Sequence, residues 1–319
     1  MSATTVSHAL NGKGRVEATT RERITQLANE LGYHPFPAAR ALQTGRTMSI
    51  GILGTFGSTD PRFEVERMYW YTRTALAAAE HALRRGYTLV LAPLSEQPHW
   101  QTAAALDGLL VVGTGMSVHS AAPAMGGLPT VIIEGDPDTN PTGVVAADPR
   151  AATRMALNHL KQRGARRPAV VLDQRDRWST RATAATYQVW CQEAGLDPLL
   201  LRVEINRGWD HAFRHCLDLL DQSDSAGTGL DAAYIPVDSA ASPFIAALEQ
   251  RGLPVPNAFR VVTSDGFVAT HSSIRFTAID VRREDAARKA VEMLIDELTN
   301  LVPSPSTVFE PQLIVRDST

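Results

Sequence analysis

From Ser49 to its C-terminus the sequence alternates short apolar runs with helical patterns, and this alternation occurs twice. The first series contains the runs SIGIL, YTLVLAP, DGLLVVG and PTVIIEG, and the second, after Asp148, contains RRPAVVLD, LLLRVEI, DAAYIPVD and FRVVTSDG. Near-continuous apolar runs are typical of parallel strands covered on both faces. The pattern therefore predicts an α/β fold with two similar doubly wound parallel-sheet lobes, whose strand ends meet at a shared cleft suited to small ligands.

A small helical segment precedes the two lobes and is joined to them by a linker that contains prolines. Pro35 and Pro37 exclude a continuous helix before them, while residues 38–42 fit one helical turn followed by Gly45. We therefore expect a hinge here. The predicted divisions are a head over 1–34, a hinge helix and linker over 35–47, an N-terminal lobe over 48–148 and 278–303, and a C-terminal lobe over 149–277 and 304–319.

Charge and hydropathy bound the partners of the chain. No window approaches the roughly 18 uninterrupted apolar residues of a spanning helix, and the N-terminus lacks the basic region and apolar core of a signal peptide. We expect a cytoplasmic protein that does not enter membranes. The net charge of -3 is unevenly distributed, because residues 1–50 carry six Lys or Arg against three acids. A basic head on an acidic body suggests that the head meets nucleic acid, although three excess charges also fit a solvated face.

Motifs of the common enzyme classes are absent from the sequence. There is no G-x-x-x-x-G-K-[ST], no G-x-S-x-G and no H-E-x-x-H, and the GTG at 113–115 lacks the third glycine of a dinucleotide-binding loop. Cys191 and Cys216 each lie in a helical pattern without a C-x-x-C partner, which favours two buried thiols over a disulfide or a zinc site. We expect no enzyme activity, no cofactor and no metal.

Four short motifs occur in order within the first 42 residues: TVSHALN from Thr5, RVEATTRERI from Arg15, ELGYHP from Glu30 and AARAL from Ala38. Together they resemble the DNA-binding head of the LacI-type (lactose repressor) family. The resemblance continues through DGLLVV, PVDSAA (236–241), SDG (264–266) and a closing P-x-L-x-V-R-x-S (311–318), and so covers essentially the whole chain. It implies a helix-turn-helix head before a two-lobed sensor with the periplasmic-binding-protein-like fold.

The resemblance assigns DNA contacts to the head. A recognition helix presents the side chains of its first turns to base edges in the major groove, while hydroxyl and amide groups hold phosphates. The positions that match are Ala3 and Thr4 for the bases, and Thr5, Ser7 and Asn11 for phosphates. His8 replaces the family's usual arginine, which should alter base choice because bidentate Arg–guanine contacts are strong. The alternative for His8 is a solvated helix residue.

The hinge carries a second implied contact. In the family, the hinge helices of two subunits pair in the minor groove and wedge an apolar side chain between base pairs. Leu42 stands at that position with Ala39 beside it, and the alternative is that Leu42 packs as a linker residue. Phe36 replaces the family's usual asparagine after the first proline.

The resemblance also implies an effector site between the lobes. In this reading, Arg181 forks two hydrogen bonds to a ligand, an aspartate at a strand end accepts from hydroxyls, and an aromatic ring stacks on the ligand. The matching positions are Thr55, Phe56, Glu134, Arg181, Trp209, Asp238 and Asp265. They fit a polar, ring-shaped ligand, which we interpret as a sugar.

Each of the sharper assignments has a structural alternative. Asp265 also fits the cap of a turn, Arg181 fits an ion pair with an acid such as Asp176, and Trp209 fits the core of a lobe. Val237 stands where sugar-binding relatives commonly have asparagine, so the identity of the effector is open.

The sequence therefore predicts a homodimeric DNA-binding transcriptional regulator that binds a pseudo-palindromic operator. Repression is favoured over activation, and the sequence leaves both open. Its operator affinity is controlled by a small metabolite that closes the cleft. The alternative is a small-molecule sensor that does not bind DNA.

The first residues read as a recognition helix without the helix that usually precedes it. About twenty residues stand before this point in typical heads, and their absence would leave Val6, Ala9 and Leu10 short of burial. We expect poor DNA binding from the chain as given, and a gene product that extends upstream with a D-V-A-x-x-A-G-like segment.

Overall fold

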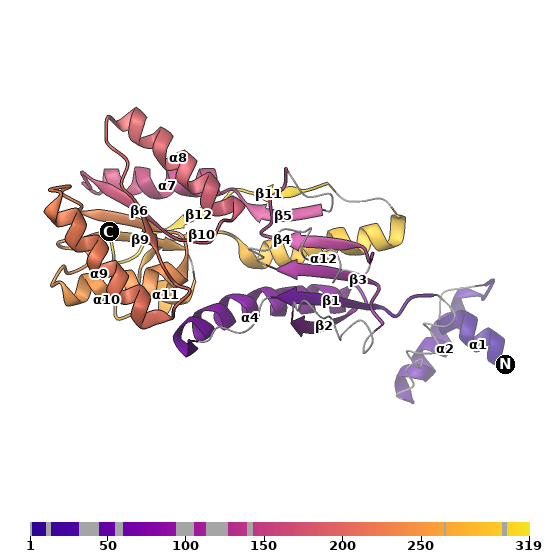
Figure 1. Ribbon diagram of the computed structural model, residues 1–319. Coiled ribbons are helices and arrows are strands. Elements are labelled where there is room, and N and C mark those ends of the chain that lie inside the picture. Colours follow the sequence, from indigo (N-terminus) through magenta and orange to yellow (C-terminus); the bar gives the residue numbers. More distant parts are fainter. Residues whose placement is uncertain are drawn as a thin grey trace. The chain divides into compact units, whose positions relative to one another are not determined.

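The computed structural model describes residues 2–10, 14–31, 45–54, 60–93, 105–112, 127–138, 143–264, 266–301 and 305–319. The chain divides into two compact units, Met1–Met48 and Ser49–Thr319 (Figure 1). The predicted hinge helix over residues 38–42 lies outside the described residues.

The first unit contains two packed helices, α1 (Ala3–Leu10) and α2 (Ala18–Glu30). The Ser2 hydroxyl starts α1 by accepting a hydrogen bond from the Thr5 amide at 3.1 Å. Ala9 and Ile24 are buried in the small contact between the two helices. Val6 and Leu10, which the sequence analysis expects to lack burial together with Ala9, are half-buried.

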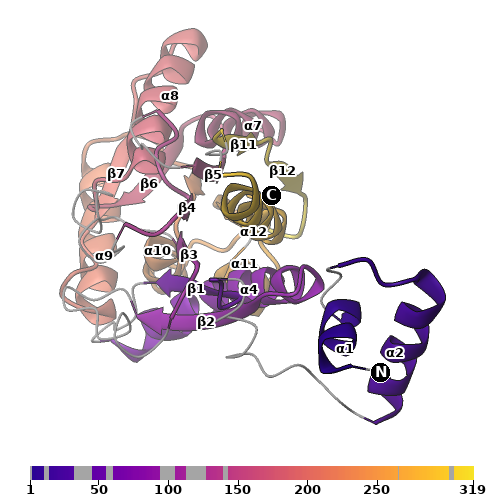
Figure 2. The same cartoon turned by 90° about the vertical axis from the view of Figure 1, so that its right-hand side faces the viewer.

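Lobe A of the second unit is built on a six-stranded parallel sheet of order β11-β5-β4-β3-β1-β2. Its strands are β1 (Ser49–Gly54), β2 (Thr88–Pro93), β3 (Gly108–Val112), β4 (Thr130–Ile133), β5 (Gly143–Ala147) and β11 (Thr307–Phe309). Helices α4 (Pro61–Arg84) and α12 (Arg283–Asn300) pack against each other on one face of this sheet (Figure 2). Every residue of β3 and β4 is buried, which is why these strands read as continuous apolar runs.

Lobe B has a second six-stranded sheet of order β12-β10-β9-β8-β6-β7, in which β12 alone is antiparallel to its neighbour. The strands are β6 (Pro168–Asp173), β7 (Leu200–Val203), β8 (Ala232–Ile235), β9 (Arg260–Ser264), β10 (Thr277–Asp280) and β12 (Gln312–Ile314). The helices are α7 (Pro149–Gln162), α8 (Trp178–Ala194), α9 (Trp209–Ser225), α10 (Asp238–Gln250) and α11 (Phe267–His271). One apolar core joins the sheet to α9 and α10, and a second joins it to α7 and α8.

The chain crosses between the lobes later than the sequence analysis places the crossings. The predicted boundary at 278 assigns most of β10 to the N-terminal lobe, but β10 hydrogen-bonds to β9 and belongs to lobe B. The predicted boundary at 304 assigns β11 to the C-terminal lobe, but β11 pairs with β5 in lobe A, and only β12 returns to lobe B. The sheet to which a strand belongs is decided by its hydrogen-bonding partner, which apolar periodicity does not reveal.

Two further expectations can be compared with the fold. Cys191 and Cys216 are free and buried, as predicted, and burial raises the pKa of the Cys216 thiol to about 12. Within the described part of the chain, no helix has the length and apolar character needed to cross a membrane.

Tyr187 of α8 provides a direct test of lobe B packing. Its hydroxyl donates to the Pro168 carbonyl at 2.7 Å and accepts from the Leu199 amide at 2.9 Å, so one buried side chain ties α8 to the segments that begin β6 and β7. We expect Tyr187→Phe to lower the free energy of unfolding by about 2 kcal/mol, because both backbone groups lose their partner. Urea titration followed by circular dichroism measures this.

The matched control is Tyr69→Phe, since Tyr69 is half-buried and contacts Phe267 and His271 through its ring. Equal unfolding midpoints for the two variants would show that the Tyr187 hydroxyl does not stabilise lobe B.

Candidate functional site

A cavity of about 440 Å³ lies between the two lobes, at the carboxyl ends of strands from both sheets. Lobe A contributes side chains from α4 and from the ends of β3, β4 and β5, and lobe B contributes the segments that follow β6, β7, β8 and β9. The polar and aromatic lining residues are Phe63, Glu66, Arg67, Trp70, Tyr71, Glu134, Asp148, Arg175, Arg177, Trp178, Ser179, Thr180, Thr183, Asn206, Tyr234, Asp238, Ser239, Ser264 and Arg283. Such a cavity suits a small polar ligand with a flat apolar face.

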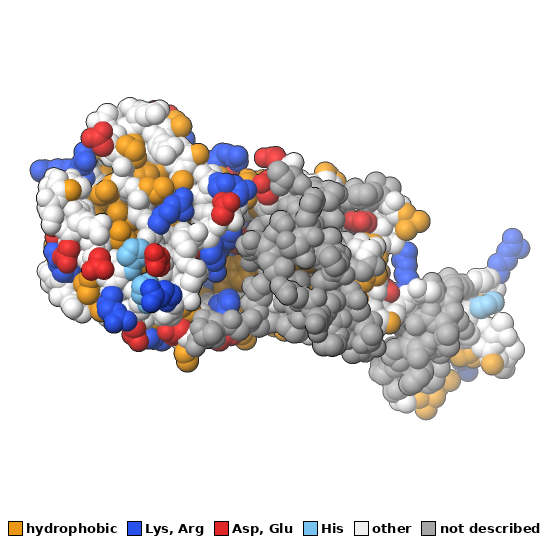
Figure 3. All heavy atoms as spheres, viewed as in Figure 1, with side chains coloured by type: hydrophobic (Ala, Val, Ile, Leu, Met, Phe, Trp, Pro, Cys, Tyr) orange, Lys and Arg blue, Asp and Glu red, His pale blue; other side chains and the backbone are white. Residues whose placement is uncertain are grey.

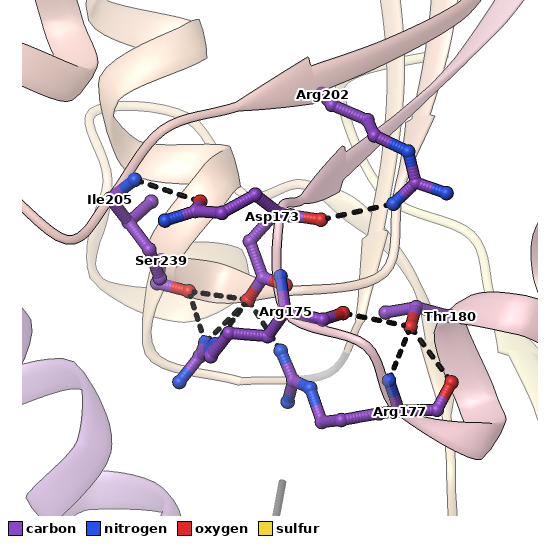
Figure 4. A network of polar contacts seen from close by, with 8 residues as sticks. Asp173, Arg175, Arg177, Thr180, Arg202, Ile205 and Ser239 are labelled. Atoms are coloured by element: carbon purple, nitrogen blue, oxygen red, sulfur yellow. Dashed lines mark hydrogen bonds and ion pairs between the residues drawn. The ribbon is translucent and has the colours of Figure 1, made fainter.

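A cluster of arginines surrounds one buried carboxylate on the lobe B side (Figure 4). The carboxylate of Asp173, at the end of β6, is fully buried and accepts from Arg175 Nε at 2.8 Å and from the Arg175 amide at 3.1 Å. The guanidinium of Arg177 also pairs with Asp173. Arg202 of β7 donates to the Asp173 carbonyl at 3.4 Å, and Ser239 accepts from Arg175 at 3.0 Å.

The charges in this cluster influence one another. Burial by itself would raise the pKa of Asp173, but the guanidinium groups of Arg177 and Arg175 hold it below its usual value. Partial burial and the neighbouring charge of Arg177 lower the pKa of Arg175. Guanidinium groups carry a positive charge in proteins, so two positive charges share one negative charge at this wall of the cavity.

Helix α4 supplies an acid of a different kind. Glu66 is buried, and burial, together with the negative charges of Asp238 and Asp60, raises its pKa to about 8. The Ser242 hydroxyl hydrogen-bonds to Glu66 and in turn accepts from Trp209 Nε1 at 3.0 Å. At neutral pH Glu66 is therefore a neutral carboxylic acid that connects α4 of lobe A to α10 and α9 of lobe B.

The first turn of α4 is bound to lobe B. Asp60 caps α4 by accepting from the Arg62 amide at 3.0 Å, and it also accepts from the Trp209 amide of α9 at 2.7 Å. Arg62 pairs with Asp210 at 2.9 Å and lies over the Trp209 ring at 4.4 Å. Phe63 is buried within the apolar core of lobe B. The lobes are thus joined by shared helix caps and shared core, beside the cavity.

A second group of charges lines the lobe A side of the cavity. Arg283, at the first turn of α12, is buried and lies 5.0 Å from the centre of the Trp70 ring. Its charge interacts with the carboxylates of Glu134 and Asp238, and burial lowers its pKa. Glu134 has a left-handed backbone with φ of 63°, a strained conformation for a non-glycine residue.

The predicted effector residues are only partly brought together. Glu134 and Asp238 line the cavity, as the sequence analysis expects, whereas Arg181 and Trp209 are absent from the described lining. Arg181 instead pairs with Asp176 at 2.9 Å, which is the alternative named for it, and also with Asp136 of lobe A at 3.6 Å. Trp209 packs against the lobe B core and stacks on Phe213, which is likewise its structural alternative. Thr55, Phe56 and Asp265 lie outside the described residues.

The cavity also contains five residues that no sequence motif had indicated: Arg175, Arg177, Trp178, Glu66 and Arg283. The run DQRDRW directly follows the strand run RRPAVVLD, so its arginines and tryptophan could have been recognised as groups at a strand end. Glu66 and Arg283 carry no such signal, because they belong to long helices that contain many other charged residues.

The predicted DNA contacts of α1 are differently exposed. Ala3, Thr4 and His8 are exposed, and Thr5 and Ser7 are half-buried. The His8 ring packs against Gly14, where φ is 67° and an added Cβ would lie 2.5 Å from His8 Nδ1. Asn11, Ala39 and Leu42 lie outside the described residues.

Two other kinds of site, a nucleic-acid surface on one face of lobe B and a metal site, find no support in the described residues. On the face of lobe B seen in Figure 3, acidic and basic side chains are interspersed, so this face has no uniform basic surface for nucleic acid. Within the described ranges, no group of three or more His, Cys, Asp or Glu side chains could hold a metal ion.

Comparisons with known proteins agree with this division into head and lobes. Residues 1–35 match the model for bacterial regulatory proteins of the lacI family, and residues 157–319 match the model for a periplasmic binding protein-like domain. The HTH-type transcriptional repressor PurR of Haemophilus influenzae (strain PittEE) is 25% identical over 343 residues, covering 100% of this chain and 95% of the relative. The PurR of Aliivibrio salmonicida (strain LFI1238) is 26% identical over 336 residues with the same coverage.

Solved structures with the same fold include regulators with bound ligands. A complex of the transcriptional regulator CelR with cellobiose aligns with a TM-score of 0.72 and 23% identity, covering 100% of this chain and 96% of that one. The lac repressor dimer bound to operator and the anti-inducer ONPF aligns with a TM-score of 0.76 and 19% identity, covering 100% and 95%. These likenesses establish the fold.

Asp60 provides a test of the junction between the lobes. We expect Asp60→Ala to lower the free energy of unfolding by about 2 kcal/mol, since it removes the cap of α4 and the acceptor for α9 together. Asp148→Ala is the matched control, because Asp148 caps α7 alone, through the Arg150 amide at 2.8 Å, and should cost about 1 kcal/mol. Equal losses in thermal or urea unfolding would contradict the double role.

Glu66 predicts a pH dependence of stability. Its pKa is raised to about 8 in the folded chain, whereas the unfolded chain ionises near 4.5, so the folded state holds the extra proton between these values. The contribution of Glu66 to the free energy of unfolding is therefore complete below about pH 4.5 and is lost as the pH rises to about 8. The free energy of unfolding falls by at most about 1.4 kcal/mol per pH unit over this range. We expect Glu66→Gln to flatten this fall, measured by urea unfolding at several pH values.

Glu80→Gln, at an exposed position of the same helix, is the control and should leave the pH profile unchanged. If the profile of Glu66→Gln runs parallel to that of the wild type, Glu66 is ionised in the folded protein and the assignment is wrong.

Proposed function

Because the chain belongs to the LacI-type family of bacterial regulatory proteins, we propose that it represses transcription by binding operator DNA as a homodimer, under the control of a small polar metabolite. The observation that carries this proposal is the occurrence, in one chain, of a LacI-type helix-turn-helix head and a two-lobed body with a polar cavity between its sheets. Neither the head nor the two-lobed body alone distinguishes a transcriptional regulator from a small-molecule-binding protein.

Helix α1 is the proposed recognition helix. Ala3, Thr4 and His8 are exposed on it and are the proposed base contacts, while Thr5 and Ser7 are half-buried and are the proposed phosphate contacts. A histidine in place of arginine forms fewer and weaker bonds to guanine, so we expect an operator that differs at the base read by this position. Two heads of a dimer read two half-sites, which makes the operator pseudo-palindromic.

The effector acts through the relative position of the lobes. A ligand in the cavity contacts α4 and α12 of lobe A and the loops of lobe B together, so it stabilises those lobe arrangements in which both sides reach it. Lobe A is continuous in sequence with the head through the segment before Ser49, and this segment carries the proposed hinge contact of Leu42 and Ala39. A change in lobe arrangement therefore alters DNA affinity, provided that the ligand prefers one arrangement.

Selection of duplexes from a random DNA library by the full-length chain tests this function. We expect enrichment of a two-fold symmetric site whose affinity falls steeply with salt, as for contacts dominated by phosphates. Thr4→Ala combined with His8→Ala should weaken binding to the selected site about tenfold or more, because each lost base contact costs about 1 kcal/mol or more.

Arg207→Ala, which removes an exposed charge from lobe B, is the control and should leave DNA affinity unchanged. If no symmetric site is enriched at low salt, the chain is a sensor that does not bind DNA, and the proposed function is wrong.

A further inference from the structure

The arginine cluster on the lobe B wall carries more positive charge than its protein partners neutralise. Asp173 already accepts from Arg175 through two donors and also pairs with Arg177, and its carboxylate has no exposed surface. Arg202 donates to the main-chain carbonyl of Asp173 and does not pair with its carboxylate. One carboxylate compensates one guanidinium, so this end of the cavity has an excess of at least one positive charge.

The other carboxylates of the described lining are engaged elsewhere. Asp148 caps α7 through the Arg150 amide. Asp238 accepts from the Phe267 amide at 3.1 Å, and both Asp238 and Glu134 interact with the buried charge of Arg283. Glu66 is neutral at pH 7, because burial raises its pKa to about 8. Arg67 also lines the cavity, but it pairs with Glu64, which is not among the described lining residues.

Two buried donors at the start of α8 add a second, independent observation. Arg177 Nε and Trp178 Nε1 are both shielded from solvent, both residues line the cavity, and no described group accepts a hydrogen bond from either atom. A buried donor without an acceptor is destabilising, so an arrangement with two of them favours a ligand that supplies the acceptor. They lie at the amino end of a 17-residue helix, where its dipole also favours negative charge.

Figure 4 shows how these groups are directed. The guanidinium groups of Arg175 and Arg177 lie on the same side of the Asp173 carboxylate, with Ser239 at one flank and Thr180 at the other. Arg177 retains 23% of its side-chain surface and Arg175 retains 41%, which leaves both groups accessible from the cavity. Planar guanidinium groups in this arrangement match the paired oxygens of a carboxylate or phosphate.

Building on the proposed function, we propose that the effector is an acidic polyhydroxylated metabolite, a sugar acid or a sugar phosphate, whose acidic group binds Arg175 and Arg177. Its hydroxyl groups face Glu134 and Asp238, which accept hydrogen bonds, and its ring or chain lies along Trp178 and Trp70. A neutral sugar leaves the excess charge of the cluster without a partner, so it binds more weakly than its acidic counterpart.

Thermal unfolding of the full-length chain at constant ionic strength tests this proposal with defined probes. Inorganic phosphate should raise the unfolding temperature relative to chloride, because it binds the folded state alone. The second series compares glucose with gluconate and with glucose 6-phosphate. A larger rise with gluconate identifies a carboxylate as the preferred group, and a larger rise with glucose 6-phosphate identifies a phosphate.

Variants locate the effect at the cluster. Arg177→Gln should lower the apparent affinity for phosphate at least tenfold, and Arg177→Lys should recover part of it, since the charge returns without the planar pair of donors. Arg181→Gln is the matched control, because it removes a charge from the same helix at a position whose two partners, Asp176 at 2.9 Å and Asp136 at 3.6 Å, both lie outside the described lining. It should bind phosphate like the wild type.

Three outcomes would overturn the proposal: no stabilisation by phosphate beyond that by chloride, undiminished phosphate binding by Arg177→Gln, or glucose matching both of its acids. The proposed function fails separately, through the DNA selection. If the chain binds a symmetric DNA site but shows no preference for acids, only the effector class is wrong. If it binds acids through Arg177 but no DNA, the cavity assignment stands and the regulatory role does not.

Discussion

The first turn of α4 is the constraint on which the two-lobed unit depends. Asp60 is a helix cap for α4 in lobe A and an acceptor for the first amide of α9 in lobe B, and Phe63, one turn later, is buried in the lobe B core. A helix whose far end packs on sheet A thus has its near end bound in the other lobe. Any change in the angle between the lobes must alter these contacts, which border the cavity.

Burial has two different effects on the carboxyl groups at the cavity: one stays ionised and the other keeps its proton. Charged groups lose solvation when they leave water, and they are kept either by pairing or by losing the charge. Asp173 stays ionised because two guanidinium groups compensate its burial, whereas Glu66, which lies near other carboxylates, holds its proton. A cluster of cations and a neutral acid therefore face the same space, and both provide hydrogen-bond donors to a ligand that accepts.

Much of the fold was accessible from local sequence signals. The apolar runs became strands of two parallel sheets because continuous burial demands apolar residues on both faces, and Asp148 followed by Pro149 starts α7 as a cap followed by a proline should. Effector contacts transferred by position within a motif stay predictions, because a position in a motif does not reveal which other groups a side chain meets in the fold. Arg181 and Trp209 match the family pattern in spacing, yet one binds a neighbouring carboxylate and the other packs on the lobe core.

The sequence alone determined the class of fold, the order of head, linker and lobes, and the burial of both cysteines, because each follows from periodicity or from residue type over short distances. Tertiary structure decided which sheet receives β10 and β11, since strand partners are chosen by contacts far apart in the chain. It also decided which charges meet in the cavity. Glu66, Arg177 and Arg283 are ordinary helix or loop residues in the sequence, and only the folding of three distant segments against one another brings them to the wall of one cavity.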